Sequence, residues 1–135
     1  VLINDTTKTQ FLFRVNKGRE VLNESINEHM PENLRPIPFS NMIYIGDGMS
    51  DVPSMALTKK NGGHTIAVHD PKKKSGLEQC VSLMRANRVD LIAPADYRKG
   101  GKLALQVELL LDAVIANIAY DEEIFGCKID HGLYA

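Results

Sequence analysis

Residues 42–51 read Met-Ile-Tyr-Ile-Gly-Asp-Gly-Met-Ser-Asp, an apolar run that ends in two glycines around a carboxylate, with a second carboxylate four residues later. A short apolar run bounded by turn residues is typical of a parallel strand that is covered on both faces. Gly46 and Gly48 would let the backbone turn sharply and come close to a bound ion. Ligands of open α/β sheets bind where such strands end. The stretch therefore predicts a buried strand that presents acid groups at the edge of a sheet.

Two carboxylates on one loop, Asp47 and Asp51, indicate a site for a hard cation. Mg²⁺ is the best candidate, because it takes oxygen ligands and usually needs only one or two carboxylates together with a substrate phosphate. We therefore predict both residues as magnesium ligands. The same two residues also fit simpler roles, since Asp51 could cap the following helix and Asp47 could be an ordinary turn residue.

The loop from Gly46 to Asp51 resembles the fourth sequence motif of the haloacid dehalogenase superfamily. That motif is a hydrophobic strand followed by Gly-Asp-Gly-x-x-Asp and then a helix, as in phosphoserine phosphatases and the phosphorylation domains of cation pumps. Residues 52–57, with a proline at the second position, continue the match. Ser50 departs from the Asn that many members carry there. The resemblance is specific over residues 8–71 and only topological afterwards.

This resemblance implies an α/β fold, a doubly wound parallel sheet like that of the Rossmann folds, of which this chain would hold the C-terminal half. It also implies a magnesium-dependent phosphohydrolase, a phosphomonoesterase that passes through an aspartyl-phosphate intermediate on small phosphorylated metabolites. Covalent catalysis by a carboxylate divides a difficult hydrolysis into two easier displacements. In such enzymes the cation and a lysine stabilise the charge on the transferred phosphoryl group. The pumps would also need flanking transmembrane helices, which we do not expect here.

The resembled enzymes carry their nucleophile in an Asp-x-Asp motif that ends the first strand, and this sequence contains no such motif. Asp90 begins an apolar run instead of ending one, and Asp130 lies in an aperiodic stretch. We therefore expect the nucleophile and any cap domain upstream of Val1, in a missing N-terminal half, and we expect this polypeptide alone to be inactive. A non-catalytic metal-binding, phosphate-binding or regulatory module of the same fold is the alternative.

Two lysines fit the third motif, whose lysine opens a helix in the resembled family and neutralises phosphoryl charge. Lys8 follows a threonine pair and precedes an apolar helical stripe. Lys17 stands in a Lys-Gly pair like the one that opens a helix in phosphoserine phosphatases. We prefer Lys8, because the apolar helix that follows would pack on the sheet and hold the ammonium near the strand ends. Both lysines remain candidates.

Composition bounds the class of protein. The chain has 135 residues, which fits one domain. Its net charge of -1 gives no electrostatic case for nucleic acid or an anionic membrane as the main partner, and we expect neither. Two cysteines without metal-type spacing favour a reducing compartment, and we expect a cytoplasmic protein. The longest apolar stretch, 103–120, is interrupted by four polar residues, from which we expect no membrane span.

Helical and β-rich segments alternate along the chain, which implies parallel strands joined by crossovers. We expect a core over residues 1–120 and an irregular tail over 121–135. We expect a first helix from about Thr7 that ends at Gly18, a second from Val21 to about Met30, and further helices at residues 52–60, 77–86 and 101–120. The expected strands are residues 1–3, as the end of a strand, and residues 42–46, 64–69 and 89–93.

Overall fold

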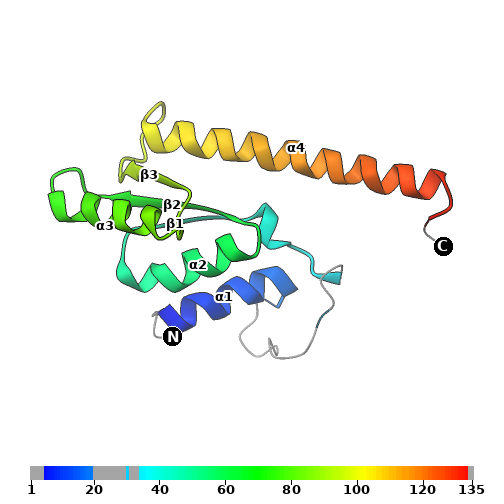
Figure 1. The fold of residues 1–135 in the computed structure, drawn as a ribbon, viewed down its shortest axis with the longest axis horizontal. Coiled ribbons are helices and arrows are strands. Elements are labelled where there is room, and N and C mark those ends of the chain that lie inside the picture. Colours follow the sequence, from blue (N-terminus) through cyan, green and yellow to red (C-terminus); the bar gives the residue numbers. More distant parts are fainter. Residues whose placement is uncertain (1–4, 20–29, 31–33, 134–135) are drawn as a thin grey trace.

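The computed structural model describes residues 5–19, 30 and 34–133. Within them, helices and strands alternate, as the sequence predicts (Figure 1). The elements are α1 (Asp5–Lys17), η2 (Phe39–Asn41), β1 (Ile43–Gly46), η3 (Met49–Asp51), α2 (Val52–Lys60), β2 (His64–His69), α3 (Lys74–Arg85), β3 (Leu91–Pro94) and α4 (Lys102–Asp130).

The three strands form one parallel sheet in the order β1-β2-β3. Ile43 pairs with His64 at one end of the β1–β2 ladder, and Gly46 pairs with Ala67 at the other. Because all strands run the same way, their carboxyl ends and the loops that follow them share one edge of the sheet. The expected α/β class with parallel pairing is confirmed.

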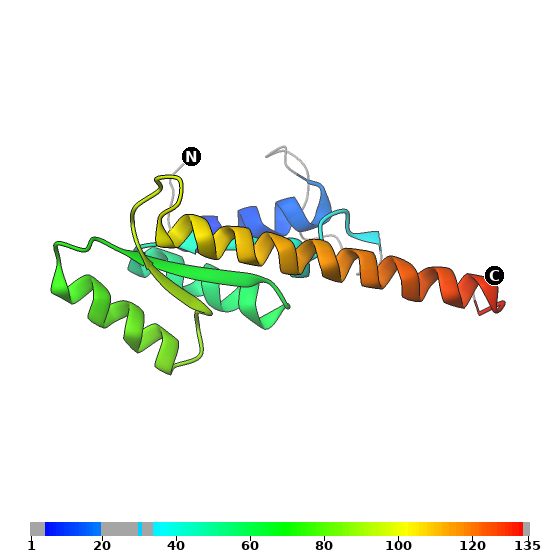
Figure 2. The same ribbon diagram turned by 90° about the horizontal axis from the view of Figure 1, so that it is seen from above.

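Alternate residues of β2 serve two separate hydrophobic clusters, one on each face of the sheet. Ile66 and Val68 pack with Leu103 of α4, whereas Ala67 packs with Met55 of α2 and Cys80 of α3. Figures 1 and 2 show α4 on one face and α2 with α3 on the other. Helix α1 lies against α2. This layering brings the amino-terminal turn of α2 to the edge where β1 ends.

Glycines end two of the helices that matter for the site. Gly18 has φ +68° and Gly62 has φ +91°, values that favour glycine. After each helix the backbone makes the paired hydrogen bonds of a Schellman turn, such as Gly63 N–H to Thr58 O at 2.8 Å and Gly62 N–H to Lys59 O at 3.1 Å. The predicted end of α1 at Gly18 and the predicted ranges 52–60 and 64–69 are confirmed.

Other boundaries differ from the predictions. α1 begins at Asp5, α3 begins three residues before the predicted 77, and β3 covers Leu91–Pro94. The irregular tail is wrong as far as Asp130, because α4 continues unbroken to that residue. Residues 121–130 lose the regular apolar stripe but contain no proline, and extending an existing helix costs far less than starting one. The expectations for 1–3 and 21–29 lie outside the described residues.

Most of α4 is uncovered. Leu103 and Val114 are buried, but Leu109 is 66% exposed and Ile115 is 62% exposed. Figures 1 and 2 show the C-terminal half of the helix extending beyond the strands. By length and composition alone α4 could cross a membrane, a test that the core helix of a soluble protein also passes. The absence of a membrane partner stays a prediction.

We expect the 135-residue polypeptide on its own to associate as its concentration rises. Its α4 exposes apolar side chains, and β1 has an unpaired edge within the described sheet. Sedimentation velocity over a concentration series would measure this association. The double variant Leu109→Glu, Ile115→Glu should shift the distribution towards the monomer. A wild-type polypeptide that stays monomeric at every concentration would contradict the expectation.

Candidate active site

The loop after β1 wraps around the carboxylate of Asp51. Residues 49–51 form the short helix η3, and Asp51 is the N-cap of α2, with Pro53 in the first turn where proline is tolerated. Oδ2 of Asp51 accepts the backbone N–H of Asp47 at 3.0 Å and that of Gly48 at 3.2 Å. The buried carboxylate therefore fixes the path of the loop that precedes it.

The other oxygen of Asp51 accepts two side-chain donors. The Lys8 ammonium lies 2.7 Å from Oδ1, and the Tyr44 hydroxyl donates to the same atom at 2.7 Å. A carboxylate has about four lone-pair sites, and here four donors fill them. Asp51 thus has no oxygen position left for a cation unless one of these donors leaves.

These contacts shift two pKa values. Burial alone would raise the pKa of Asp51, but the hydrogen bonds from Lys8, Tyr44 and the two amides outweigh it and hold that pKa below its ordinary value. Burial, together with the hydrogen bond to Asp51, raises the pKa of Tyr44 to about 12. Asp51 is therefore an anion and Tyr44 a neutral donor at neutral pH.

The pKa of Tyr44 predicts loss of stability at high pH. The folded state holds the protonated phenol, so its contribution is complete below the ordinary value of 10.0 and declines as the pH rises towards about 12. Tyrosinate absorbance and the free energy of unfolding should change together in this window, and Tyr44→Phe should remove the linked change. If the profile of Tyr44→Phe matches the wild type, Tyr44 does not carry it.

Gly46 is required by the position of Asp51. A Cβ at residue 46 would lie 2.7 Å from Cβ of Asp51 and 2.8 Å from its Cγ, closer than real contacts. At Gly48 the nearest such atom is Oδ2 of Asp51, at 3.9 Å. The two glycines of the motif therefore have different importance for packing. The missing side chain at Gly46 leaves room for the Asp51 carboxylate, whereas a side chain at Gly48 would make only an ordinary contact with it.

We expect Gly46→Ala to destabilise the protein by about 1–3 kcal/mol, the usual cost of overpacking. Gly48→Ala is the matched control and should cost no more than about 0.5 kcal/mol, because its Cβ meets open space and ordinary contacts. Urea denaturation would measure both. Equal effects of the two substitutions would show that the packing of Asp51 against residue 46 does not matter.

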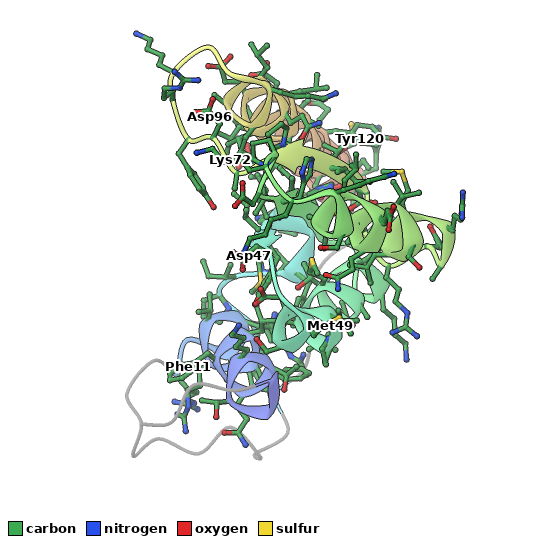
Figure 3. The ribbon with its side chains drawn as sticks, turned by 90° about the vertical axis from the view of Figure 1, so that its left-hand side faces the viewer. Phe11, Asp47, Met49, Lys72, Asp96 and Tyr120 are labelled. Carbon is green, nitrogen blue, oxygen red and sulfur yellow. The ribbon has the colours of Figure 1, made fainter. Side chains whose placement is uncertain are left out.

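Asp47 has the opposite environment to Asp51. Its side chain is exposed and, in the part of the chain that the structure describes, no side chain or backbone group binds its carboxylate. It lies at the carboxyl edge of the sheet, which faces the viewer in Figure 3. The described residues contain no group of three or more His, Cys, Asp or Glu side chains that could enclose a metal. Asp47 fits a single ligand to Mg²⁺, which can be completed by water and a substrate phosphate.

The structure brings Lys8 to the site and leaves Lys17 away from it. Lys17 lies nine residues further along α1, which corresponds to about 13 Å along the helix axis. Its ammonium lies over the Phe13 ring, 5.8 Å from the centroid. The contact of Lys8 also includes Ser50, whose hydroxyl accepts from Nζ at 2.7 Å.

Three other carboxylates, those of Asp70, Asp90 and Asp96, have partners away from Asp51. The Asp70 carboxylate accepts the Lys72 N–H at 2.9 Å in a turn. Asp96 forms an exposed ion pair with Arg98 at 2.7 Å, and this pair lowers its pKa to about 2. Asp90 accepts from Thr65 and lies 3.0 Å from Lys59, at the start of β3.

Tyr44 was missed by the sequence prediction. Strand residues two apart share a face, so Tyr44 lies on the same side of β1 as Gly46, where Asp51 packs. The alternation of side chains along the strand was the sequence signal that could have identified Tyr44. A tyrosine two positions before a glycine can reach over the space that the glycine leaves. The bond itself depends on how the loop returns and could not be predicted from spacing alone.

Comparisons with known proteins give one relative. No family model matches the chain, and no solved structure matches it. Over 104 aligned residues, the chain is 38% identical to an uncharacterized protein of Borreliella burgdorferi. The aligned residues make up 75% of this chain and 34% of that protein. The chain therefore spans about a third of the length of the relative it matches.

Proposed function

We propose that this chain supplies the cation-binding and lysine-bearing half of the active site of a magnesium-dependent phosphohydrolase of the haloacid dehalogenase superfamily. One observation carries the proposal: a loop at the carboxyl end of a parallel strand holds an exposed carboxylate, Asp47, which has no partner among the described residues and lies beside a partly buried Lys8–Asp51 ion pair at 2.7 Å. In this proposal the described sheet is the C-terminal part of a doubly wound core. The complete enzyme would be a cytoplasmic phosphomonoesterase that acts on small phosphorylated metabolites.

The two carboxylates then have different roles. Asp47 would hold Mg²⁺ together with the substrate phosphate, and the bound cation would neutralise charge on the phosphoryl oxygens. Asp51 is a positioning residue, since its four bonds hold Lys8, Tyr44 and the loop in place. We propose this division in place of the prediction that both residues ligate the cation.

Lys8 keeps one donor for the substrate. An ammonium has three N–H groups, of which one points to Asp51 and one to Ser50. The third can bind a phosphoryl oxygen at the same edge of the sheet. The Asp51 carboxylate holds the ammonium in place, so that its charge is available when negative charge develops during phosphoryl transfer.

The nucleophile would come from a part of the protein outside these 135 residues. The sequence contains no Asp-x-Asp motif, and β1 has one unpaired edge within the described sheet. A parallel strand added there would bring its own carboxyl end beside Asp47. This arrangement is consistent with a relative about three times as long as the matched segment.

The test is the Mg²⁺ dependence of phosphomonoester hydrolysis by the complete protein. We expect turnover with Mg²⁺, none after chelation, and recovery when Mg²⁺ is restored. The 135-residue polypeptide alone should be inactive under the same conditions. Turnover that ignores chelation, or robust turnover by the polypeptide alone, would refute the proposal.

A non-catalytic metal-binding, phosphate-binding or regulatory module of the same fold is the second candidate. The absence of a nucleophile motif from the sequence favours it. The upstream sequence of the complete protein separates the two candidates. An apolar strand that ends in Asp-x-Asp supports the enzyme, whereas its absence supports the module.

A further inference from the structure

A polar hollow opens at the carboxyl end of β2, between the loop after that strand and the first two turns of α3. Its wall includes Asp47, so the hollow adjoins the candidate cation site. Figure 3 looks at this edge, where Asp47 follows β1 and Lys72 follows β2. A group attached to a phosphate held at Asp47 could therefore extend into the hollow.

The lining offers hydrogen bonds of both kinds. Nδ1 of His69 is fully buried and has no hydrogen-bond partner among the described residues. Ser75 and Gln79 lie on successive turns of α3 and expose a hydroxyl and a carboxamide. Because Nδ1 of His69 is enclosed, a ligand would meet the exposed side chains of Ser75 and Gln79, and a ligand hydroxyl suits both because it can donate and accept.

The charges of the lining argue against a second anionic group on the ligand. Lys73 is the one lysine or arginine of the lining, and Asp47 and Asp70 are its carboxylates. The Mg²⁺ proposed at Asp47 and the substrate phosphate that it would bind carry opposite charges of about two, which cancel. Lys73 then still faces two carboxylates, so a ligand that carries a further phosphate or carboxylate would be repelled at least as much as attracted. Apolar lining is limited, so an aromatic or aliphatic group would also gain little.

The backbone around the hollow is held in place before any ligand arrives. Asp70 accepts the Lys72 N–H with its side chain at 2.9 Å and the Lys73 N–H with its carbonyl at 3.0 Å. A Cβ at Gly76 would lie 3.4 Å from Cβ of His69, so the glycine allows α3 to approach the strand closely. A fixed wall lowers the cost of ordering the site on binding.

We propose that this hollow binds the leaving group of the phosphorylated substrate and selects one that carries hydroxyls, as in a sugar phosphate or a polyol phosphate. The inference rests on the proposed phosphohydrolase function and adds the substrate class to it. The hydroxyls of the leaving group would bind Ser75 and Gln79.

The test compares substrates in the complete protein with Mg²⁺ present. The wild type should hydrolyse glucose 6-phosphate or glycerol 3-phosphate with a higher kcat/KM than phosphoserine. The double variant Ser75→Ala, Gln79→Ala should lower kcat/KM for the hydroxylated substrate about 10- to 100-fold, the effect of losing two hydrogen bonds. Its kcat/KM for p-nitrophenyl phosphate should stay within about twofold, since that leaving group carries no hydroxyl that donates and its nitro oxygens accept only weakly. Ser82→Ala, an exposed serine of α3 outside the hollow, is the control and should match the wild type.

The outcomes separate the two proposals. If the protein hydrolyses p-nitrophenyl phosphate but the double variant lowers both substrates equally or neither, the subsite is refuted while the phosphohydrolase stands. A preference for phosphoserine over both hydroxylated substrates also refutes the subsite. If no substrate is hydrolysed, the proposed function fails. Calorimetry would then measure whether glycerol 3-phosphate binds to the protein in the presence of Mg²⁺, which tests the hollow separately. Binding that the double variant weakens supports the hollow, and no binding refutes it.

Discussion

Asp47→Asn should reduce Mg²⁺-dependent turnover of the complete protein by about a hundred- to a thousandfold, while the protein stays folded. The substitution keeps the shape of the side chain but removes the charge that would attract the cation, and a group that stabilises transition-state charge contributes factors of this size. Its exposed position and lack of side-chain partners among the described residues predict a change of no more than about 0.5 kcal/mol in unfolding free energy.

Steady-state kinetics over a range of Mg²⁺ concentrations would measure the effect of Asp47→Asn. Asp70→Asn is a suitable control, because it changes a neighbouring carboxylate that takes part in a turn. It should leave the Mg²⁺ dependence of p-nitrophenyl phosphate hydrolysis unchanged. Equal turnover of Asp47→Asn and the wild type at every Mg²⁺ concentration would exclude Asp47 as the ligand.

Asp51→Asn should instead destabilise the protein, by about 3 kcal/mol, the lower end of the range for breaking a buried ion pair. The side chain of Asp51 is 9% exposed, so its four donors would face an amide that accepts fewer hydrogen bonds. We use the lower end of this range because the Lys8 side chain is 25% exposed, so its ammonium can be partly solvated when the carboxylate is removed. Turnover should fall as well, because Lys8 loses its anchor.

Urea denaturation of Asp51→Asn and Asp47→Asn side by side would measure this contrast. The two variants make the same chemical change four residues apart, so their difference reports the environment alone. The stability contributed by Asp51 in the wild type should be present above its ordinary pKa of 3.8 and decline as the pH falls below it, since its folded pKa is lower. If Asp51→Asn costs no more than Asp47→Asn, the four hydrogen bonds do not stabilise the fold.

The strand, loop and helix around the site were predictable because each has a strong local signal. An apolar run, two glycines, a capping residue and an early proline together identify β1 and α2, and Asn61 with two glycines identifies the end of α2. The placement of Lys8 had a partial signal, since an apolar stripe after it predicts a helix that packs near the sheet edge. Local patterns of this kind depend on a few neighbouring residues.

The distinct environments of Asp47 and Asp51 could not be predicted in the same way. Lys8 and Asp51 are 43 residues apart, and their contact depends on α1 lying against α2. Spacing within the motif shows that two carboxylates are near each other but not which one is filled by donors. The extension of α4 to Asp130 also lacked a signal, because exposed helix residues show no apolar periodicity.

The most direct test of the central claim is to locate the phosphoryl group during turnover. The complete protein, quenched in acid during hydrolysis with Mg²⁺, should carry an aspartyl phosphate that hydroxylamine removes. Peptide mapping should place it outside the 135 residues described here, and Asp47→Asn should prevent its formation. A phosphoryl group on a residue within this chain, or steady turnover with no phosphoenzyme, would contradict the proposal that this chain supplies the cation-binding and lysine-bearing half of the site.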